Sequence, residues 1–256
     1  MAPLLLGRLG RRSARPPEEG LAVSEGLCQR PIRCYQLLGN QVTLSEGDAV
    51  LTNTGWKTWA GSWLLAKHLE VFLPRLPEQP RRILDLSCGT GLAGVALAKA
   101  GYEVVLCDLA ENVALVRENL ARNAWKHPEV ESAQVVDYAW GRPLPEELQG
   151  GFDLVLCGDL LFHVWNGKLQ TEFMQTLQEL CRRRCRFPCR FGGGGPAIVF
   201  AGQVRSGRQE SQVVDNVANR LGYLQVPLSL DPNWFSTSSP LLADAKYRII
   251  RLEPAG

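Results

Sequence analysis

The stretch Ile83-Leu-Asp-Leu-Ser-Cys-Gly-Thr-Gly91 decides how this chain of 256 residues folds. Its apolar first half is typical of a buried strand, and Gly89, Gly91 and Gly94 then form a G-x-G-x-x-G loop that opens a helix. Glycine is needed there because the turn is tight and a ligand must approach bare backbone. The helix then presents its first amides to that ligand. The stretch therefore predicts a strand, a ligand-binding loop and a helix.

Downstream of this loop, strand-like and helix-like segments alternate, which predicts a parallel sheet with right-handed crossovers. The last two apolar runs have no clear helix between them and are expected to return antiparallel at the sheet edge. We predict one α/β domain over residues 31–256: a Rossmann-like, seven-stranded, mostly parallel sheet with helices on both faces and an antiparallel C-terminal strand pair. The expected strands are 83–86, 103–108, 133–137, 152–157, 197–201, 223–229 and 246–252, and the expected helices are 92–100, 112–123, 168–183 and 209–221.

Upstream of the glycine loop, the sequence predicts a hairpin, a helix and a tail. Residues 34–45 are expected to form a β-hairpin with Gly39-Asn40 at its turn. Residues 58–73 form a largely apolar helical segment that the following prolines end. Residues 1–17 carry four arginines and no acidic residue. We interpret residues 1–30 as a disordered tail, with a mitochondrial targeting segment as the alternative.

Composition excludes several classes of protein. Apolar residues make up 45% and charged residues 21%, a globular balance, and the net charge of +2 is too small to indicate nucleic acid. No apolar run reaches the roughly 18 residues of a membrane span. Cys88, Cys107 and Cys157 fall in or just after strand-like runs, as buried free thiols do. We expect a reduced, cytoplasmic protein, with mitochondria as the alternative.

One basic, glycine-rich segment interrupts the alternation at residues 181–196. It carries five arginines and four consecutive glycines, which is typical of a mobile loop. Its three cysteines follow a C-x3-C-x3-C spacing, but no fourth ligand and no paired C-x2-C knuckle accompany them. We therefore predict no metal site here.

Acidic residues close successive strands at the edge where α/β sheets bind ligands. Asp85 places a carboxylate beneath the glycine loop, where it would repel a pyrophosphate and attract an ammonium. Asp108 ends the next strand, where an acid can accept hydrogen bonds from both ribose hydroxyls. Asp137 or Trp140 follows the third strand and is a candidate neighbour of an adenine. Strand-end aspartates also cap turns, but three in succession favour a nucleoside-bearing ligand with an ammonium.

Three motifs together resemble a known family. Leu84-Asp-Leu-Ser-Cys-Gly-Thr-Gly-Leu92, Val105-Leu-Cys-Asp108 and Asp153-Leu-Val-Leu-Cys-Gly-Asp-Leu-Leu-Phe162 are similar to motifs of the seven-β-strand methyltransferases. The Trp-bearing segment around Trp59 and the Asp159-x-x-Phe162 signature resemble, more narrowly, the small protein-lysine methyltransferases sometimes called family 16. The resemblance covers roughly residues 35–252 and implies the cofactor S-adenosylmethionine.

The resemblance also implies roles for individual residues. Asp159 and Phe162 would lie on the side of the substrate lysine, and His163 beside them is a possible proton acceptor that is equally a surface residue. Ser87 stands where the family usually has glycine, and serine is expected to tolerate the turn only with a negative φ. The implied cofactor neighbours are Trp59, Asp85, Ser87, Cys88, Gly89, Gly91, Asp108, Asp137, Trp140 and Gly158.

The sequence is compatible with three functions. The resemblance implies an S-adenosylmethionine-dependent methyltransferase acting on lysines of a protein such as a translation factor or chaperone. A methyltransferase with a small-molecule or nucleic-acid acceptor is a second reading, although Asp159-Leu-Leu-Phe162 replaces the Asn/Asp-Pro-Pro-Tyr that nucleic-acid amino-methylating enzymes often carry. A catalytically silent binding module that keeps the fold is the third, and Ser87 keeps it open.

Overall fold

The computed structural model describes residues 30–47, 53–76, 80, 82–123, 133–183, 194–235, 241–242 and 244–255. Most of the predicted tail and most of the basic loop at 181–196 fall outside these residues. No helix in the described part of the chain is long and apolar enough to cross a membrane.

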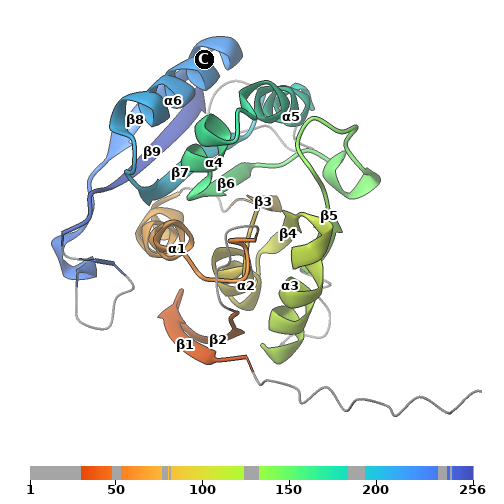
Figure 1. The fold of residues 1–256 in the computed structure, drawn as a ribbon, viewed down its shortest axis with the longest axis vertical. Coiled ribbons are helices and arrows are strands. Elements are labelled where there is room, and N and C mark those ends of the chain that lie inside the picture. Colours follow the sequence, from red (N-terminus) through yellow and green to blue (C-terminus); the bar gives the residue numbers. More distant parts are fainter. Residues whose placement is uncertain are drawn as a thin grey trace, which may run out of the picture.

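The seven-stranded sheet is mostly parallel and has an antiparallel C-terminal strand pair, as predicted. Its strand order is β5-β4-β3-β6-β7-β9-β8 (Figure 1). Strands β3 to β7 run parallel, and β9 pairs antiparallel with both β7 and β8. The last strand of the chain therefore lies between β7 and β8. The strands are β3 (Arg82–Leu86), β4 (Glu103–Asp108), β5 (Ala133–Asp137), β6 (Leu154–Gly158), β7 (Ala197–Gln203), β8 (Tyr223–Leu228) and β9 (Tyr247–Pro254).

In the described part of the chain, helices cover both faces of this sheet (Figure 1). Because successive strand residues point to opposite faces, Ile83 and Val104 pack toward α1, α2 and α3, whereas Leu84 and Val105 pack toward α4, α5 and α6. The helices are α1 (Ala60–Phe72), α2 (Leu92–Lys99), α3 (Ala110–Arg122), α4 (Leu160–Asn166), α5 (Gln170–Arg182) and α6 (Gly207–Leu221), with 3₁₀ turns η1 (Leu73–Arg75), η2 (Glu146–Leu148) and η3 (Pro232–Trp234).

One helix and the bounds of several elements, β6 among them, differ from the prediction. Helix α4 was not predicted: it begins directly after Asp159 and buries Leu160, Leu161 and Val164 against the second core. At seven residues it is too short to show helical periodicity in the sequence. Strand β6 begins at Leu154, two residues later than the apolar run suggests. Buried Phe152 is apolar because it packs in the core ahead of the strand.

The predicted hairpin forms and docks beside the glycine loop. Its strands are β1 (Ile32–Leu37) and β2 (Asn40–Ser45). Asn119 of α3 accepts a hydrogen bond from the Ser45 backbone N–H (2.7 Å) and donates to the carbonyls of Ser45 (3.1 Å) and Thr90 (3.0 Å). One fully buried amide thus satisfies backbone groups of two segments. The hairpin is thereby fixed to the glycine loop.

Candidate active site

A cavity of about 460 Å³ opens at the carboxyl ends of β3, β4 and β6. The strand order changes direction here, since β4 lies on one side of β3 and β6 on the other. Ligands of α/β sheets bind at such switch points, and this volume is typical of small-molecule sites. The predicted residues that line the cavity are Trp59, Ser87, Cys88, Gly89, Asp108, Trp140, Gly158 and Asp159.

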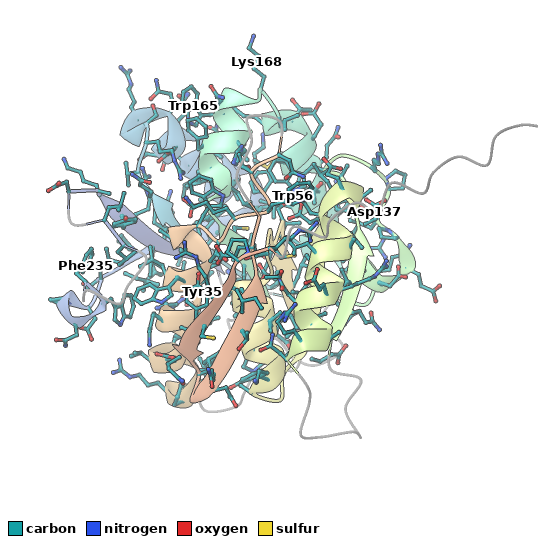
Figure 2. The ribbon with its side chains drawn as sticks, turned by 60° about the horizontal axis from the view of Figure 1, so that its bottom comes forward. Tyr35, Trp56, Asp137, Trp165, Lys168 and Phe235 are labelled. Atoms are coloured by element: carbon teal, nitrogen blue, oxygen red, sulfur yellow. The ribbon has the colours of Figure 1, made fainter. Side chains whose placement is uncertain are left out.

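The other four predicted residues lie around this cavity. Asp85 is buried beneath the loop, and Gly91 is a buried residue of the loop itself. Asp137 ends β5 in register with Asp108, but its side chain is exposed (Figure 2). Phe162 lines a smaller hollow on the far side of Asp159.

The glycine loop uses left-handed backbone at three of its positions. Gly89 and Gly91 have φ values of +57° and +83°, which glycine adopts without strain. Ser87 has a φ of +58°, so the expectation of a negative φ at this serine is wrong. The turn between β3 and the loop requires the left-handed conformation whichever residue occupies it, and serine adopts it at a cost of about 1–2 kcal/mol.

Asp85 lies beneath the loop with almost no exposure. Its Oδ2 accepts a hydrogen bond of 2.9 Å from the backbone N–H of Gly94 at the first turn of α2. Burial raises the pKa of Asp85 to about 7, and the nearby Asp108 carboxylate adds to this. The carboxyl group therefore stabilises the loop from below and titrates near neutral pH.

Asp108 is held by its neighbours at the end of β4. Its Oδ2 accepts a hydrogen bond from the Gly89 N–H (2.7 Å), and its Oδ1 accepts from the Leu109 N–H (2.8 Å) and the Asn112 amide (2.7 Å). Burial raises the pKa of Asp108, while these hydrogen bonds oppose the rise. Since a carboxylate has about four acceptor positions, one remains free on Oδ2.

Asn112 is a cavity residue that the sequence analysis missed. It is 4% exposed, and its Oδ1 has no hydrogen-bond partner among the described residues. It lies four residues after Asp108, in the first turn of α3, and a polar side chain so close to a strand-end acid is the signal that could have identified it. Asp108 and Asn112 together offer two adjacent acceptor atoms, where the sequence suggested that Asp108 alone would supply both.

Trp140 and Asp137, the two alternatives after β5, differ in position. Trp140 lines the cavity and packs edge-on against buried Phe173 at 4.9 Å between ring centroids, whereas Asp137 does not line it. Tyr138 lines the cavity as well and donates its backbone N–H to the Asp108 carbonyl. The geometry therefore favours Trp140 over Asp137 as the aromatic wall.

The two tryptophans at the start of α1 lie in different surroundings. Trp63 belongs to the core, where it packs edge-on against Trp234. Trp59 precedes the first residue of α1, lines the cavity and donates its indole N–H to the Thr54 carbonyl (2.8 Å). Trp59 is thus the tryptophan of this pair that a bound molecule can contact.

Asp159 caps the start of α4 in a left-handed conformation, with a φ of +53°. The residue is only 8% exposed. The carboxylate accepts hydrogen bonds from the backbone N–H groups of Gly61 and Gln203 (3.0 Å for the latter) and from the Arg205 guanidinium (3.1 Å). It is a carboxyl group oriented by these hydrogen bonds, and it lines both the cavity and the smaller hollow beyond.

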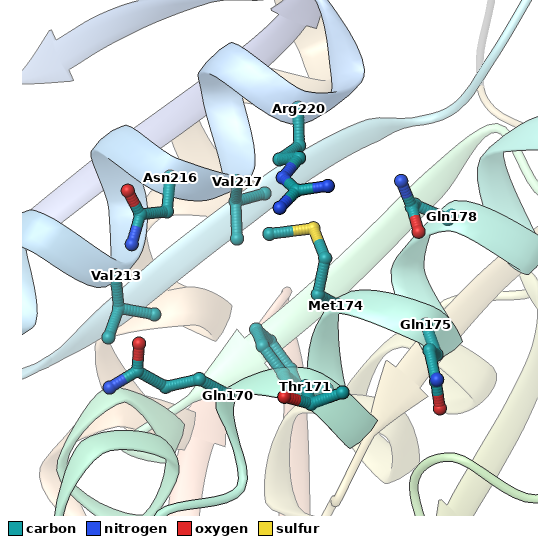
Figure 3. A pocket seen from close by; sticks show the side chains of 10 residues that line it. Gln170, Thr171, Met174, Gln175, Gln178, Val213, Asn216, Val217 and Arg220 are labelled. Atoms are coloured by element: carbon teal, nitrogen blue, oxygen red, sulfur yellow. The ribbon is translucent and has the colours of Figure 1, made fainter.

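A second hollow, of about 430 Å³, lies between α5 and α6 (Figure 3). Its lining comes from these two helices, with Gln170, Met174 and Gln178 on one side and Asn216 and Arg220 on the other. None of its lining residues belongs to the loops at the carboxyl ends of the parallel strands. The candidate active site is therefore the first cavity.

A family model described as lysine methyltransferase matches residues 40–190, more than half of the chain. Protein N-lysine methyltransferase METTL21A of Mus musculus is 25% identical over 166 residues, 65% of this chain and 73% of that protein. METTL21A of Danio rerio is 28% identical over 150 residues, 57% of this chain and 62% of that protein. EEF1A lysine methyltransferase 3 of Xenopus tropicalis is 23% identical over 147 residues, with coverage of 57% and 62%.

Solved structures with a similar fold are also methyltransferases. A 16S rRNA methyltransferase of T. thermophilus, RsmC, superposes with a TM-score of 0.55 at 18% identity, covering 88% of this chain and 50% of that one. The methyltransferase domain of bacterial CtHen1 gives 0.52 at 14% identity, covering 77% and 98%. At these identities the likeness concerns the fold alone.

Proposed function

Because the chain belongs to the lysine methyltransferase family, we propose that it transfers a methyl group from S-adenosylmethionine to the side-chain amine of a lysine in a protein. The observation that carries the proposal is the cavity at the strand ends. The glycine loop and Asp108 line it, and so do Trp59 and Asp159. Relatives named as protein-lysine methyltransferases support a protein acceptor, such as a translation factor or a chaperone.

The cofactor side of the cavity fits S-adenosylmethionine. Asp108 and Asn112 supply two neighbouring acceptor atoms for ribose hydroxyls, and the Asn112 oxygen is otherwise unpartnered in the described residues. Trp140 offers a ring face to the adenine, and the buried Asp85 favours an ammonium nearby. When bound, this cofactor supplies a methyl group on a sulfonium sulfur, which leaves as an uncharged thioether.

The acceptor side must bind a lysine amine and favour its uncharged form. A free lysine is mostly protonated at neutral pH because its ordinary pKa is about 10.4. Desolvation beside Trp59 in the cavity would lower that pKa. Asp159 would accept one N–H of the amine and thereby orient its lone pair toward the cofactor. The proton released after transfer leaves to solvent.

Calorimetric titration with S-adenosylhomocysteine tests the cofactor half of the proposal. We expect saturable heat at a stoichiometry of one per chain. Absence of both heat and thermal stabilisation would overturn every methyltransferase reading at once.

Labelling of a cell extract with tritiated S-adenosylmethionine tests the acceptor half. Label that disappears with protease, survives nuclease and appears as methyl-lysine after acid hydrolysis supports the proposal. Label in nucleic acid or in small molecules would replace it with the second reading. Cofactor binding without label in any fraction would favour the silent binding module.

Substitution of Asp159 then tests whether this residue acts on the lysine and not on the cofactor. Asp159→Asn removes the charge while it keeps the shape of the side chain, and we expect loss of methyl transfer with S-adenosylhomocysteine affinity retained. Asp215→Asn, at an exposed aspartate of α6, is the matched control and should leave both quantities unchanged. Equal loss of both in Asp159→Asn would show that Asp159 belongs to the cofactor side.

A further inference from the structure

Arg205, two residues after β7, reaches the acceptor side of the candidate active site. Its guanidinium donates a hydrogen bond of 3.1 Å to Oδ1 of Asp159, and its side chain is 24% exposed. The same guanidinium lies over the ring of Trp59 at 5.5 Å and over that of Phe162 at 5.4 Å. One cation therefore contacts three residues that the sequence assigned to the site, and these come from two separate segments of the chain.

The hydrogen bonds of Asp159 leave one position for a substrate. Oδ1 accepts from the Gln203 N–H and from Arg205, which fills both of its lone pairs. Oδ2 accepts from the Gly61 N–H alone, so one acceptor position remains there. Arg205 thus fixes which oxygen, and which lone pair, an incoming amine can use.

Arg205 also changes the charge that the amine meets. A lone carboxylate would favour the ammonium form of a bound lysine, which has no lone pair to react. With Arg205 paired to it, Asp159 presents a hydrogen-bond acceptor with its charge largely cancelled. The pair therefore allows the amine to be oriented without being held in its protonated form.

No other charged group in the described residues competes with Asp159 for the Arg205 guanidinium in the contacts below. Glu210 of α6 accepts the Arg205 backbone N–H (3.1 Å), but its carboxylate is paired with Arg248 of β9 (3.0 Å). Desolvation and the Arg205 charge lower the pKa of His163 on α4, so that ring is neutral at neutral pH. Lys57 lies over Trp59 at 5.5 Å and adds positive charge on the cavity side.

We propose that Arg205 is a positioning residue for methyl transfer. It holds Asp159 so that Oδ2 accepts one hydrogen bond from the lysine, and it cancels the aspartate charge so that the lysine binds as the uncharged amine. This inference rests on the proposed lysine methyltransferase activity.

The pH dependence of methyl transfer within the bound complex tests this role. Enzyme preloaded with tritiated S-adenosylmethionine is mixed with an extract of cells that lack the enzyme, at extract concentrations where the rate no longer rises. Labelled methyl-lysine is then counted after hydrolysis. In the plot of rate against pH, the acid limb is the fall in rate at low pH, where the bound lysine is protonated. Arg205→Gln keeps a donor for Asp159 but has no charge, so the lysine stays protonated to higher pH. We expect the acid limb of this variant to move to higher pH by about 1–3 units. Arg205→Lys keeps the charge and should hold the wild-type limb.

Arg251→Met is the matched control. Arg251 also combines an ion pair, to Glu253 at 2.6 Å, with an aromatic contact, to Phe72 at 4.5 Å, but it belongs to β9 outside the cavity. Its removal should leave the profile unchanged. Arg205→Met is carried in parallel as a second uncharged variant, and S-adenosylhomocysteine titration verifies the fold of each variant.

Three results would overturn the inference. The first is an acid limb in Arg205→Gln at the same pH as in the wild type, and the second is a shift in Arg205→Lys as large as that in Arg205→Gln. The third is loss of S-adenosylhomocysteine binding in both uncharged variants, which would show that Arg205 has a structural role. A wild-type enzyme that labels no lysine contradicts the proposed function instead, so the two failures are distinguishable.

Discussion

The backbone N–H of Gly61 donates a hydrogen bond to the carboxylate of Asp159, and no side chain fits between them. A Cβ on Gly61 would lie 2.5 Å from the Asp159 nitrogen and 2.6 Å from both its Oδ2 and the Ala201 carbonyl. Gly61 belongs to the first turn of α1, and Asp159 directly follows β6. The close approach therefore fixes α1 against the acceptor side of the cavity.

Gly61→Ala should displace Asp159 and lower the rate of methyl transfer at least tenfold, because the added methyl group overlaps backbone atoms that cannot move aside. Affinity for S-adenosylhomocysteine should change little, since the glycine loop is not in contact. Gly207→Ala is the control, as its Cβ would meet only a side-chain carbon at 3.6 Å. A fully active Gly61→Ala enzyme would contradict the assigned position of Asp159.

Ser87→Gly should stabilise the protein by roughly 0.5–1 kcal/mol. The left-handed strain of about 1–2 kcal/mol is removed, and the greater freedom of glycine in the unfolded chain offsets part of the gain. Thermal unfolding should show a rise of about 2–4 °C per kcal/mol. Lys168→Gly, at a φ of +55° on a residue that projects from the surface, should give a similar gain (Figure 2).

The same pair of variants decides whether Ser87 weakens cofactor binding. Because the φ of Ser87 already has the value that glycine would adopt, we expect S-adenosylhomocysteine affinity in Ser87→Gly to stay within about threefold of the wild type. A tenfold or larger increase, absent from Lys168→Gly, would instead identify Ser87 as the residue that weakens the site.

Trp140→Ala should lower the affinity for S-adenosylhomocysteine roughly 5- to 150-fold, corresponding to the loss of about 1–3 kcal/mol of stacking on a base. Asp137→Ala should leave the affinity within twofold, since that side chain is exposed and does not line the cavity. Calorimetric titration measures both. The reverse order of effects would restore Asp137 as the adenine neighbour.

Asp85→Asn should alter how the stability of the cofactor-free protein depends on pH. Burial raises the pKa of Asp85 from 3.8 to about 7. Between these values the folded protein holds a proton that the unfolded chain has released, so stability falls as pH rises toward 7 and is level above it. Denaturant unfolding of the wild type should show a loss on the order of 2–3 kcal/mol from pH 5 to pH 8 through this group. Asp85→Asn should lack that loss, whereas an exposed control, Asp215→Asn, should retain it; equal pH slopes in all three would refute the prediction.

Several elements could be predicted from the sequence because their signals are local. Strand β4 has the expected bounds, and β3 and α2 differ from theirs by one residue, since apolar alternation and the glycine loop mark them directly. Helix α4 was missed because seven residues between a strand and another helix carry too little periodicity. The sign of φ at Ser87 was also misjudged, since the turn and not the residue type dictates it.

By itself, the sequence determined the seven-stranded α/β class, the glycine loop and the succession of acids at the strand ends, because residue type and spacing fix strand direction and which edge the loops share. Only the tertiary structure decided which of those side chains meet. Arg205, Asp159 and Trp59 are far apart in the chain, and they converge because β6 and β7 are neighbours and α1 packs across them. The choice of Trp140 over Asp137 and the free oxygen of Asn112 likewise depend on side-chain packing, which no local spacing in the sequence records.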